Sequence, residues 1–202
     1  MLNIDPNDQT ERENYKLMTG TIIPRPIAFV TSVNNEGVIN GAPFSYFNIV
    51  TADPPMISLS IQRKDGQQKD TVDNILQTKE FVIHIVDEHN VEEINKSAAN
   101  LAREESELDK MNVQVVNSKA VKVPGIKEAK VRFECQLEKH IPLGDKEVTT
   151  DLIIGRILQY HIDPSIYADD GKIKMDQLKA VSRLAGNNYA KVGEHFTLVR
   201  PQ

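Results

Sequence analysis

The sequence predicts a mainly β fold with short helices, arranged as a closed antiparallel β-barrel. Stretches rich in β-branched and aromatic residues are short and are bounded by turns that contain Gly, Pro or Asn. Helical spacing of apolar residues is confined to a few brief segments. The strands do not alternate regularly with helices, which a doubly wound parallel sheet would require.

The size and charge of the chain narrow its class. It has 202 residues, 40% of them hydrophobic, so we expect a single domain over residues 1–202 with one core. The formal net charge of −5 argues against nucleic acid or a membrane as partner, because both attract a basic field. No apolar run approaches the ~20 residues of a membrane span, and the N-terminus is polar, unlike a signal peptide. We therefore expect a cytoplasmic protein.

The N-terminal part predicts an arm followed by a hairpin. Residues 1–20 are polar and predict an arm or short helix. Pro24 and Pro26 then hold the backbone extended. Residues 27–33 are rich in β-forming side chains and predict a strand. Residues 34–37, Asn-Asn-Glu-Gly, predict a hairpin turn because Asn and Gly tolerate positive φ, and a return strand follows.

Three more strands are predicted in the first half of the chain. Residues 44–50 and 56–61 have β-forming composition, and Asp53-Pro54-Pro55 separates them. Consecutive prolines cannot continue a hydrogen-bonded ladder, so the chain is expected to turn there. Residues 80–86 form the third strongly β segment.

Helical patterns in this half are short. Residues 70–76 predict a helix capped by Asp70 or Thr71. Apolar residues at helical spacing predict a second helix over residues 91–101. The acidic stretch 103–109 is interpreted as a solvated helix or loop whose charge serves solubility.

Two strand patterns dominate the second half. Residues 129–141 alternate between apolar and polar, so the face with Cys135 is expected in the core and the face with Glu134 in solvent. A turn is predicted at residues 142–145, and a second strand at residues 152–162.

The C-terminal extension comprises residues 163–202. Helical spacing predicts a helix over residues 175–184. Residues 195–199 are β-like in composition and predict a strand in the tail.

The common catalytic motifs are absent from the sequence. There is no G-x-G-x-x-G after a strand, no P-loop, no G-x-S-x-G elbow and no H-E-x-x-H. The five histidines are dispersed, and no spacing predicts a metal site. Cys135 is the single cysteine, so an internal disulfide is excluded, and we expect it in the core.

Residues 63–71 carry the parts of a phosphate site. Arg63, Lys64 and Lys69 supply positive charge, and Thr71 supplies a hydroxyl beside the backbone amides of a helix start. A polar loop that only caps a helix would have similar composition, so both interpretations remain open at this point.

Residues 40–48, Asn-Gly-Ala-Pro-Phe-Ser-Tyr-Phe-Asn, combine small residues, hydroxyls, an amide and aromatic rings. A planar heteroaromatic ring with polar edges needs such a lining, because the backbone must approach closely and offer a few donors and acceptors. A core strand preceded by a Gly-Ala-Pro loop is the alternative.

Taken in order, these stretches resemble the flavin reductase-like, FMN-binding split-barrel family, with the flavoredoxin branch as the nearest match. The segments that carry the resemblance extend over residues 15 to 201 and include Pro24-Arg25-Pro26, the stretch 40–47, Asp53-Pro54-Pro55, Lys69-Asp70-Thr71, Leu143-Gly144-Asp145, Ile154-Gly155-Arg156 and Arg183-Leu184-Ala185-Gly186. Each motif is short, and their ordered combination is what makes the resemblance specific.

The resemblance implies an antiparallel Greek-key split β-barrel that forms a homodimer and binds FMN near the dimer interface. The residues that it implies for the isoalloxazine ring and ribityl chain are Ala42, Ser45, Tyr46, Phe47 and Asn48. Those that it implies around the phosphate are Ser60, Arg63, Lys64, Lys69 and Thr71, with Asn74 as support. Asn100, Arg183 and Tyr189 are expected near the pocket, and His140 could face a slot over the flavin.

The resemblance also implies a function. The flavin performs redox chemistry itself, so no catalytic side chain and no metal are expected. The protein is expected to act as an NAD(P)H-dependent flavin reductase or oxidoreductase that passes hydride or electrons through bound FMN. The alternatives are a non-enzymatic, flavoredoxin-like electron carrier to a protein partner and a haem-binding module of the same fold.

Overall fold

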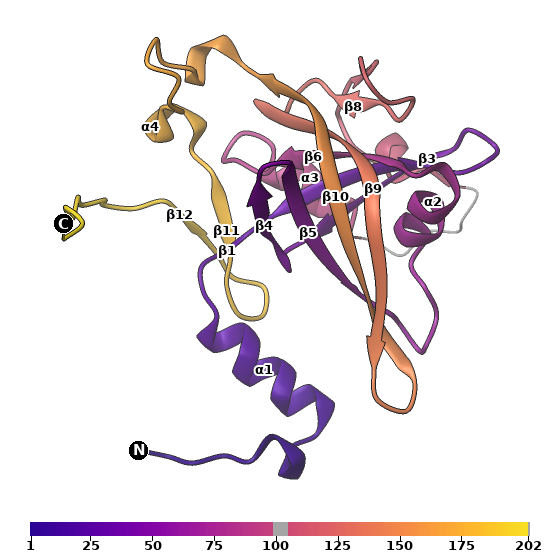
Figure 1. Cartoon of the computed structure of the whole chain (residues 1–202), viewed down its shortest axis with the longest axis vertical. Coiled ribbons are helices and arrows are strands. Elements are labelled where there is room, and N and C mark those ends of the chain that lie inside the picture. The colour runs from indigo at the N-terminus through magenta and orange to yellow at the C-terminus, as the bar shows by residue number, and fades with distance from the viewer. Residues whose placement is uncertain (99–104, 202) are drawn as a thin grey trace.

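The computed structural model describes residues 1–98 and 105–201. Its main feature is a seven-stranded antiparallel sheet in the order β3-β2-β6-β9-β10-β5-β4 (Figure 1). The strands are β2 (Ala28–Val33), β3 (Ile39–Phe44), β4 (Phe47–Ala52), β5 (Pro55–Gln62), β6 (Glu80–Ile85), β9 (Val131–Gly144) and β10 (Val148–Ile162). The mainly β, antiparallel fold class is confirmed.

The strands of this sheet do not pair in chain order. After β5 the chain crosses through α2 (Asp70–Thr78) to β6, which pairs with β2. β9 pairs with β6, and β10 runs back along β9 to pair with β5. The order places strands from both halves of the chain side by side, as expected for a Greek-key barrel.

The expected single core is divided: the largest buried cluster lies between the curved sheet and α2, and a second one packs β2 against α3 and η2. Alternate residues of β5, Ile57, Leu59 and Ile61, are buried together with the apolar face of α2. A fully buried aliphatic side chain of this kind contributes roughly 1.5–3 kcal/mol. Cys135 belongs to the same core, as predicted, and burial raises the pKa of its thiol.

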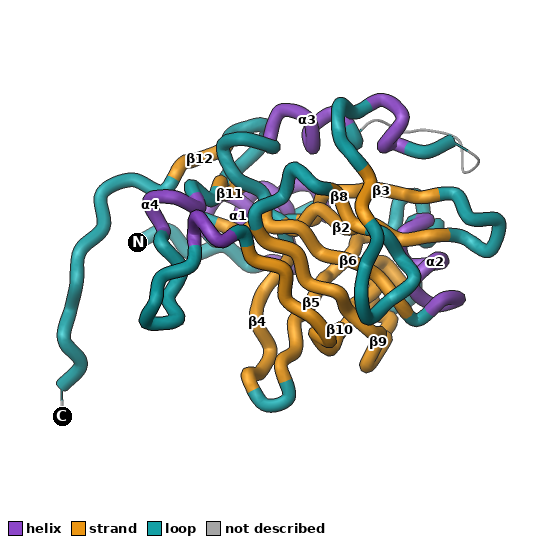
Figure 2. The backbone as a smooth tube through the Cα atoms, turned by 90° about the horizontal axis from the view of Figure 1, so that it is seen from above, coloured by secondary structure: helices purple, strands orange, loops and turns teal. Residues whose placement is uncertain are grey.

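Smaller elements surround the sheet. The helices are α1 (Glu11–Thr21), α3 (Val91–Lys96) and α4 (Met175–Leu178), with 3-10 turns η1 (Pro6–Asp8), η2 (Glu107–Lys110) and η3 (Pro164–Ile166). A three-stranded sheet joins β1 (Arg25–Pro26), β11 (Val181–Arg183) and β12 (Tyr189–Lys191), and β7 (Val115–Val116) pairs with β8 (Gly125–Ile126). α1 projects from the body in Figure 1, and the C-terminal segment leaves it as an extended tail in Figure 2.

The predicted N-terminal arm is a helix with a regular start. Thr10 accepts a hydrogen bond from the Glu13 amide, and the Glu13 carboxylate accepts one from the Thr10 amide, which forms a capping box. The strands predicted at residues 27–33, 56–61, 80–86 and 152–162 are all present.

The strand predicted at residues 44–50 is interrupted. Phe44 ends β3, the chain bends at Ser45 and Tyr46, and Phe47 begins β4. Composition did not reveal this corner, because it is created by pairing: Phe44 pairs with Ala28 of β2, whereas Phe47 pairs with Leu59 of β5.

The predicted cap of the helix that begins at Asp70 is wrong. Lys69 is the N-cap residue and makes no side-chain capping hydrogen bond. The Thr71 hydroxyl donates instead to Asn40 Oδ1 at 2.7 Å, across to β3. A tertiary contact has therefore taken the side chain that a local cap would have used.

The predicted solvent face of β9 is wrong at Glu134, whose carboxylate is fully buried. It accepts hydrogen bonds from the backbone N–H groups of Lys119, Ala120 and Val121 and lies in contact with His161. The loop that contains residues 119–121, shortly before β9, covers this face, so a charged side chain is buried where strand alternation places it in water.

Three predictions near the ends of elements also differ. β9 continues to Gly144, so the turn predicted at residues 142–145 begins later. The helix predicted over residues 175–184 ends at Leu178, because Lys179 is left-handed (φ 54°) and the chain then pairs with β1. The tail 195–199 forms no strand.

The helix predicted over residues 91–101 is tested only in part. α3 ends at Lys96, and the predicted end of the helix lies outside the described residues.

Within the described part of the chain, no helix is long and apolar enough to cross a membrane.

Candidate functional site

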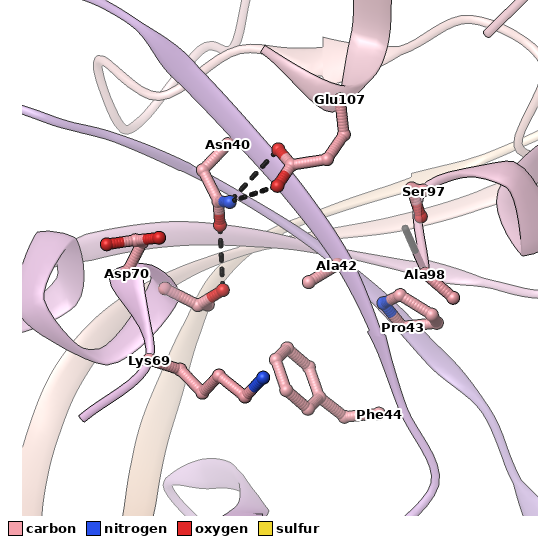
Figure 3. Close-up of a pocket in the computed structure, with 10 residues that line it drawn as sticks. Asn40, Ala42, Pro43, Phe44, Lys69, Asp70, Ser97, Ala98 and Glu107 are labelled. Atoms are coloured by element: carbon pink, nitrogen blue, oxygen red, sulfur yellow. Dashed lines mark hydrogen bonds between the residues drawn. The ribbon is translucent and has the colours of Figure 1, made fainter. Parts of the chain in front are cut away.

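A pocket of about 250 Å³ lies along β3, up to the residue before the β3–β4 corner, and we call it the corner pocket (Figure 3). β3, the start of α2, the end of α3 and η2 contribute to it. It is lined by Asn40, Ala42, Pro43, Phe44, Lys69, Asp70, Thr71, Ser97, Ala98 and Glu107. Three predicted site residues, Ala42, Lys69 and Thr71, are thus brought together.

A chain of hydrogen bonds forms one wall of this pocket. Thr71 donates to Asn40 Oδ1, and the Asn40 amide nitrogen lies 3.0 Å from both carboxylate oxygens of Glu107 (Figure 3). Glu107 also accepts from the Gly41 amide at 3.0 Å. This series of hydrogen bonds fixes the relative positions of α2, β3 and η2, which come from three different parts of the sequence.

Gly41 is required for this arrangement. A Cβ atom at this position would lie 2.5 Å from Leu108 Cδ1 and 2.7 Å from Phe29 Cζ. The absence of a side chain lets η2 approach β3 closely enough for Glu107 to reach the backbone.

Charge in the corner pocket is unevenly distributed. The Lys69 ammonium lies beside Phe44 at one end, and Glu107 lies at the other (Figure 3). Burial, followed by repulsion from Asp70, raises the pKa of Glu107, while hydrogen bonds from Gly41 and Asn40 oppose the shift. The cationic end is therefore the end suited to an anionic group.

Glu107 was not predicted as a site residue. The acidic stretch 103–109 is expected in solvent, yet Leu108 within it and Met111 just after it are buried. These apolar residues, three positions apart, were the sequence signal that the segment packs onto the body.

A second and larger pocket adjoins the corner pocket. It measures about 530 Å³ and shares Pro43, Phe44 and Ala98 with the first. We call it the tyrosine pocket; its lining is Tyr15, Thr19, Arg25, Ile27, Pro43, Phe44, Ser45, Tyr46, Asn95, Ala98, Arg183, Asn187 and Tyr189. Four predicted site residues lie here: Ser45, Tyr46, Arg183 and Tyr189.

Side chains of the tyrosine pocket are held by specific contacts. The Arg183 guanidinium lies 4.5 Å from the centre of the Tyr189 ring, and the Tyr189 hydroxyl donates to Asn95 Oδ1 at 3.0 Å. The Tyr46 hydroxyl is buried, and it has no hydrogen-bond partner among the described residues. Burial raises the pKa of Tyr46.

A third pocket, of about 400 Å³, lies between the end of α1 and β4. Ser45 and Tyr46 separate it from the tyrosine pocket, and the predicted residues Phe47 and Asn48 line it. Phe47 is also part of the hydrophobic core, so its position depends on packing as well as on the pocket.

Arg63 is not brought into the corner pocket. Its Nε and Nη2 atoms each lie 2.9 Å from the buried carboxylate of Asp151, which also accepts from Gln68 and contacts His140 at 2.8 Å. Burial alone would raise the pKa of Asp151, but these hydrogen bonds outweigh it and lower the pKa. The salt bridge raises the pKa of Arg63. Its charge is therefore largely neutralised within the fold.

Ser60, Lys64 and Asn74 line none of these three pockets. Ser60 lies on β5, where its amide donates to the Tyr46 carbonyl at 2.9 Å. Asn74 lies behind the corner pocket and donates to Ser32 Oγ at 3.1 Å, while its buried Oδ1 has no partner in the described part of the chain. Lys64 is exposed, and Asn100 lies outside the described residues.

These pockets could hold a planar, partly polar ring with an anionic tail. The small residues Ala42 and Ser45 give access to the backbone, and Lys69 supplies a cation next to the first amides of α2. The buried hydroxyl of Tyr46 and the buried amide oxygen of Asn74 have no hydrogen-bond partner among the described residues, as expected at a ligand site. No group of His, Cys, Asp and Glu among the described residues could hold a metal ion.

The fold is that of a mainly β, antiparallel protein with two adjoining pockets along β3. Residues 19–174 match the flavin reductase like domain, and the chain belongs to the flavin reductase-like family.

Relatives and solved structures agree with this assignment. YwrF of Bacillus subtilis (strain 168) is 54% identical over 193 residues, covering 94% of each chain. Nitrilotriacetate monooxygenase component B from Bacillus cereus is 55% identical, with a TM-score of 0.96 over 98% of each chain. The 2-nitrobenzoate 2-nitroreductase NbaA of Pseudomonas fluorescens is 30% identical, with a TM-score of 0.89 over 99% of this chain and 96% of that one.

More distant structures share the fold alone. A protein with a split barrel domain from Shewanella frigidimarina NCIMB 400 is 19% identical, with a TM-score of 0.85 over 96% of each chain. Flavoredoxin of Desulfovibrio vulgaris (Miyazaki F) is 21% identical, with a TM-score of 0.74 over 87% of this chain and 90% of that one. The predicted split-barrel fold is confirmed.

Proposed function

We propose that this protein is an NAD(P)H-dependent flavin oxidoreductase that binds FMN at the corner of β3 and β4. The observation that carries the proposal is the pair of adjoining pockets at that corner, in a chain of the flavin reductase-like family. One pocket has a cationic end at a helix start, and the other has aromatic walls.

Lys69 and the start of α2 are the elements that would hold the FMN phosphate. A phosphate monoester carries nearly two negative charges near neutrality, so a cation and backbone amides both stabilise it. The Thr71 hydroxyl already donates to Asn40, so at Thr71 the amide is the donor that remains for the phosphate. Ser60 and Arg63 stay candidates for this role, although Arg63 would have to share its guanidinium with Asp151.

Ala42, Ser45, Tyr46, Phe47 and Asn48 follow one another along the corner and would line the ring and the ribityl chain. Asn74 would support this lining from behind, and Arg183 and Tyr189 would lie near the exposed face. When bound, FMN supplies hydride and electron transfer, and the protein positions it and limits its contact with water.

An enzymatic role is favoured over that of an electron carrier. The 55% identical structure is that of a monooxygenase component. The monooxygenase reaction needs electrons from an external donor, which a flavin reductase supplies. The likeness to flavoredoxin is more distant and extends to the fold alone. We further propose a homodimer in the cytoplasm, with NAD(P)H or a protein as electron donor.

The first experiment is an absorption spectrum of the purified protein before and after addition of FMN. We expect flavin bands or a titration to one FMN per chain, followed by rapid bleaching with NADH or NADPH in stopped flow. Protein that neither contains nor binds flavin would contradict the proposal. Bleaching only by a reduced protein donor would leave the flavin site and replace the enzyme with a carrier.

Lys69→Ala tests the phosphate site. Loss of a charged hydrogen bond costs roughly 1.5–3 kcal/mol, so we expect FMN affinity to fall by about 10- to 150-fold. Lys146→Ala removes an equal charge from the exposed turn between β9 and β10 and serves as the control. Equal FMN dissociation constants for the two variants would exclude the role given to Lys69.

A further inference from the structure

We propose that the tyrosine pocket binds the second substrate of the flavin, a planar organic anion, and that Arg183 pairs with its negative charge. The inference rests on the proposed function, because the tyrosine pocket adjoins the corner pocket: FMN would place its phosphate in the corner pocket and its ring along the wall that the two pockets share. It assigns Arg183 and Tyr189 to substrate recognition, separate from the cofactor.

The charge of the lining supports an anionic ligand. The described residues that line the tyrosine pocket include two arginines and no acidic residue, although the whole chain has a formal net charge of −5. The corner pocket, in contrast, contains Asp70 and Glu107 beside Lys69. The tyrosine pocket is therefore the more positive of the two, and it favours a negatively charged ligand.

The two arginines differ in what they can offer to a ligand. Arg25 is buried, and its guanidinium already donates to the carbonyls of Thr19, Ile22 and Leu184. These three hydrogen bonds join the end of α1 to the segment after β11, so the Arg25 guanidinium has little capacity left for a ligand.

Arg183 retains more of its hydrogen-bonding capacity. Among the described residues its guanidinium donates once, from Nη2 to the Gly186 carbonyl at 2.6 Å. The Arg183 guanidinium lies over the Tyr189 ring, 4.5 Å from the ring centre. This contact orients the guanidinium before a ligand arrives. Nε and Nη1 remain for a carboxylate or phosphate.

The walls suit a flat ring. Tyr15, Tyr46 and Tyr189 contribute aromatic surface, and Phe44 belongs to the wall shared with the corner pocket. The hydrogen bond from Tyr189 to Asn95 limits the rotation of one ring. The Tyr46 hydroxyl, buried without a partner among the described residues, is an available donor for a polar group of the ligand.

The fold brings these residues together from both ends of the chain. Arg183 pairs with Arg25 of β1 and with Tyr189 of β12 in the small three-stranded sheet. Figure 1 shows that this sheet lies beside the large sheet, next to the end of α1. The C-terminal segment therefore completes a pocket whose floor is the β3–β4 corner.

The test is a calorimetric titration of the FMN-loaded protein with benzoate and with benzamide, a neutral ring of similar shape. We expect saturable benzoate binding that is at least about 10-fold tighter than benzamide binding, because one charged hydrogen-bonded pair separates them. Nicotinamide mononucleotide, titrated in the same way, reveals whether the anion is that of a nicotinamide donor or of an acceptor.

Arg183→Gln keeps a polar side chain on β11 and removes its charge. We expect benzoate affinity to fall about 10-fold, to the level of benzamide, with FMN affinity within about twofold of the unmodified protein. Arg156→Gln makes the same exchange on β10, outside the lining of both pockets, and should leave both affinities unchanged.

Several results would overturn the assignment. The first is that neither benzoate nor nicotinamide mononucleotide binds saturably. The second is that benzoate and benzamide bind with equal affinity. The third is that Arg183→Gln leaves anion binding unaffected. A large loss of FMN affinity in Arg183→Gln would return Arg183 to the cofactor site. If the protein binds no FMN, the proposed function fails, and the same titrations of the flavin-free protein still test the tyrosine pocket.

Discussion

At the scale of single residues, His84 is the clearest case of a titratable group enclosed by the fold. It is fully buried, Nδ1 lies 3.0 Å from the Phe29 carbonyl, and Nε2 accepts from the Ile126 amide at 2.9 Å. Both contacts are satisfied only by the neutral ring with its proton on Nδ1. Burial is the main cause that lowers the pKa of His84 from 6.5 to about 3.

This arrangement predicts a loss of stability in mild acid. The unfolded chain binds a proton at His84 below pH 6.5 and the folded chain does not, so the contribution is complete above pH 6.5 and is lost as pH falls toward 3. The free energy of unfolding, from urea titrations at pH 7, 6, 5 and 4.5, should fall with a slope that approaches about 1.4 kcal/mol per pH unit.

A matched variant isolates the histidine. His84→Gln cannot take up a proton, so its stability should change less steeply with pH over the same window. The buried carboxylates Asp151 and Glu134 have lowered pKa values and lose their contributions only below their ordinary values of 3.8 and 4.5. Equal slopes for the two proteins would show that another group controls acid sensitivity.

The sequence predicted individual residues well where their neighbours in the chain determine their environment. The backbone start of α2 and the burial of Cys135 are examples. It failed where a partner arrives from far away. Glu107 reaches Asn40 and Gly41 across 66 or more positions, and no local pattern encodes that contact.

At the scale of elements, the hairpin of β9 and β10 is the largest unit of the sheet, and Gly155 lies at an irregularity in its pairing. A Cβ at Gly155 would collide with the ring of Phe81, which is fully buried, and would lie 3.3 Å from Ile57 Cδ1. The missing side chain is what allows β10 to close over the Phe81 ring.

Gly155→Ala should therefore destabilise the fold. Overpacking of a well-filled core costs typically 1–3 kcal/mol, and chemical denaturation would measure it as a lower free energy of unfolding. Gly20→Ala is the control, since no atom lies within 4 Å of a Cβ there and the position is in helix α1. A Gly155→Ala variant as stable as Gly20→Ala would mean that the Phe81 ring can move aside without cost.

Elements were predictable in type and less so at their ends. β-branched runs identified β2, β5, β6 and β10, because strand propensity and burial act together there. The corner at Ser45 and Tyr46 was missed although it is central to the site. Its composition continues that of the strands on either side, and only the pairing of β3 and β4 with different neighbours reveals it.

At the scale of the whole molecule, apolar residues gather on the surface where α1 meets β4. The exposed hydrophobic residues of this face are Leu17, Met18, Ile22, Ile23, Ile49 and Val50. Ile49 alone is 77% exposed. Burial of these side chains against a partner would add hydrophobic free energy, which supports the homodimer that we propose.

The partner that suits this face is a second copy of the chain. The face borders the third pocket, which Ser45 and Tyr46 separate from the tyrosine pocket, so a subunit packed here would lie beside the proposed flavin. We expect light scattering after gel filtration to give twice the chain mass of 22.7 kDa. The interface would explain why α1 projects so far from its own barrel (Figure 1).

Ile49→Lys should convert the proposed homodimer into monomers, because a buried ammonium without a partner costs several kcal/mol. Asn35→Lys introduces the same charge at the exposed turn before β3 and should leave the mass doubled. If the flavin site depends on the interface, FMN affinity should fall in Ile49→Lys and stay unchanged in Asn35→Lys. A monomeric Ile49→Lys that binds FMN normally would place the whole flavin site within one chain, and an unmodified protein that is already monomeric would mean that this apolar face has another partner.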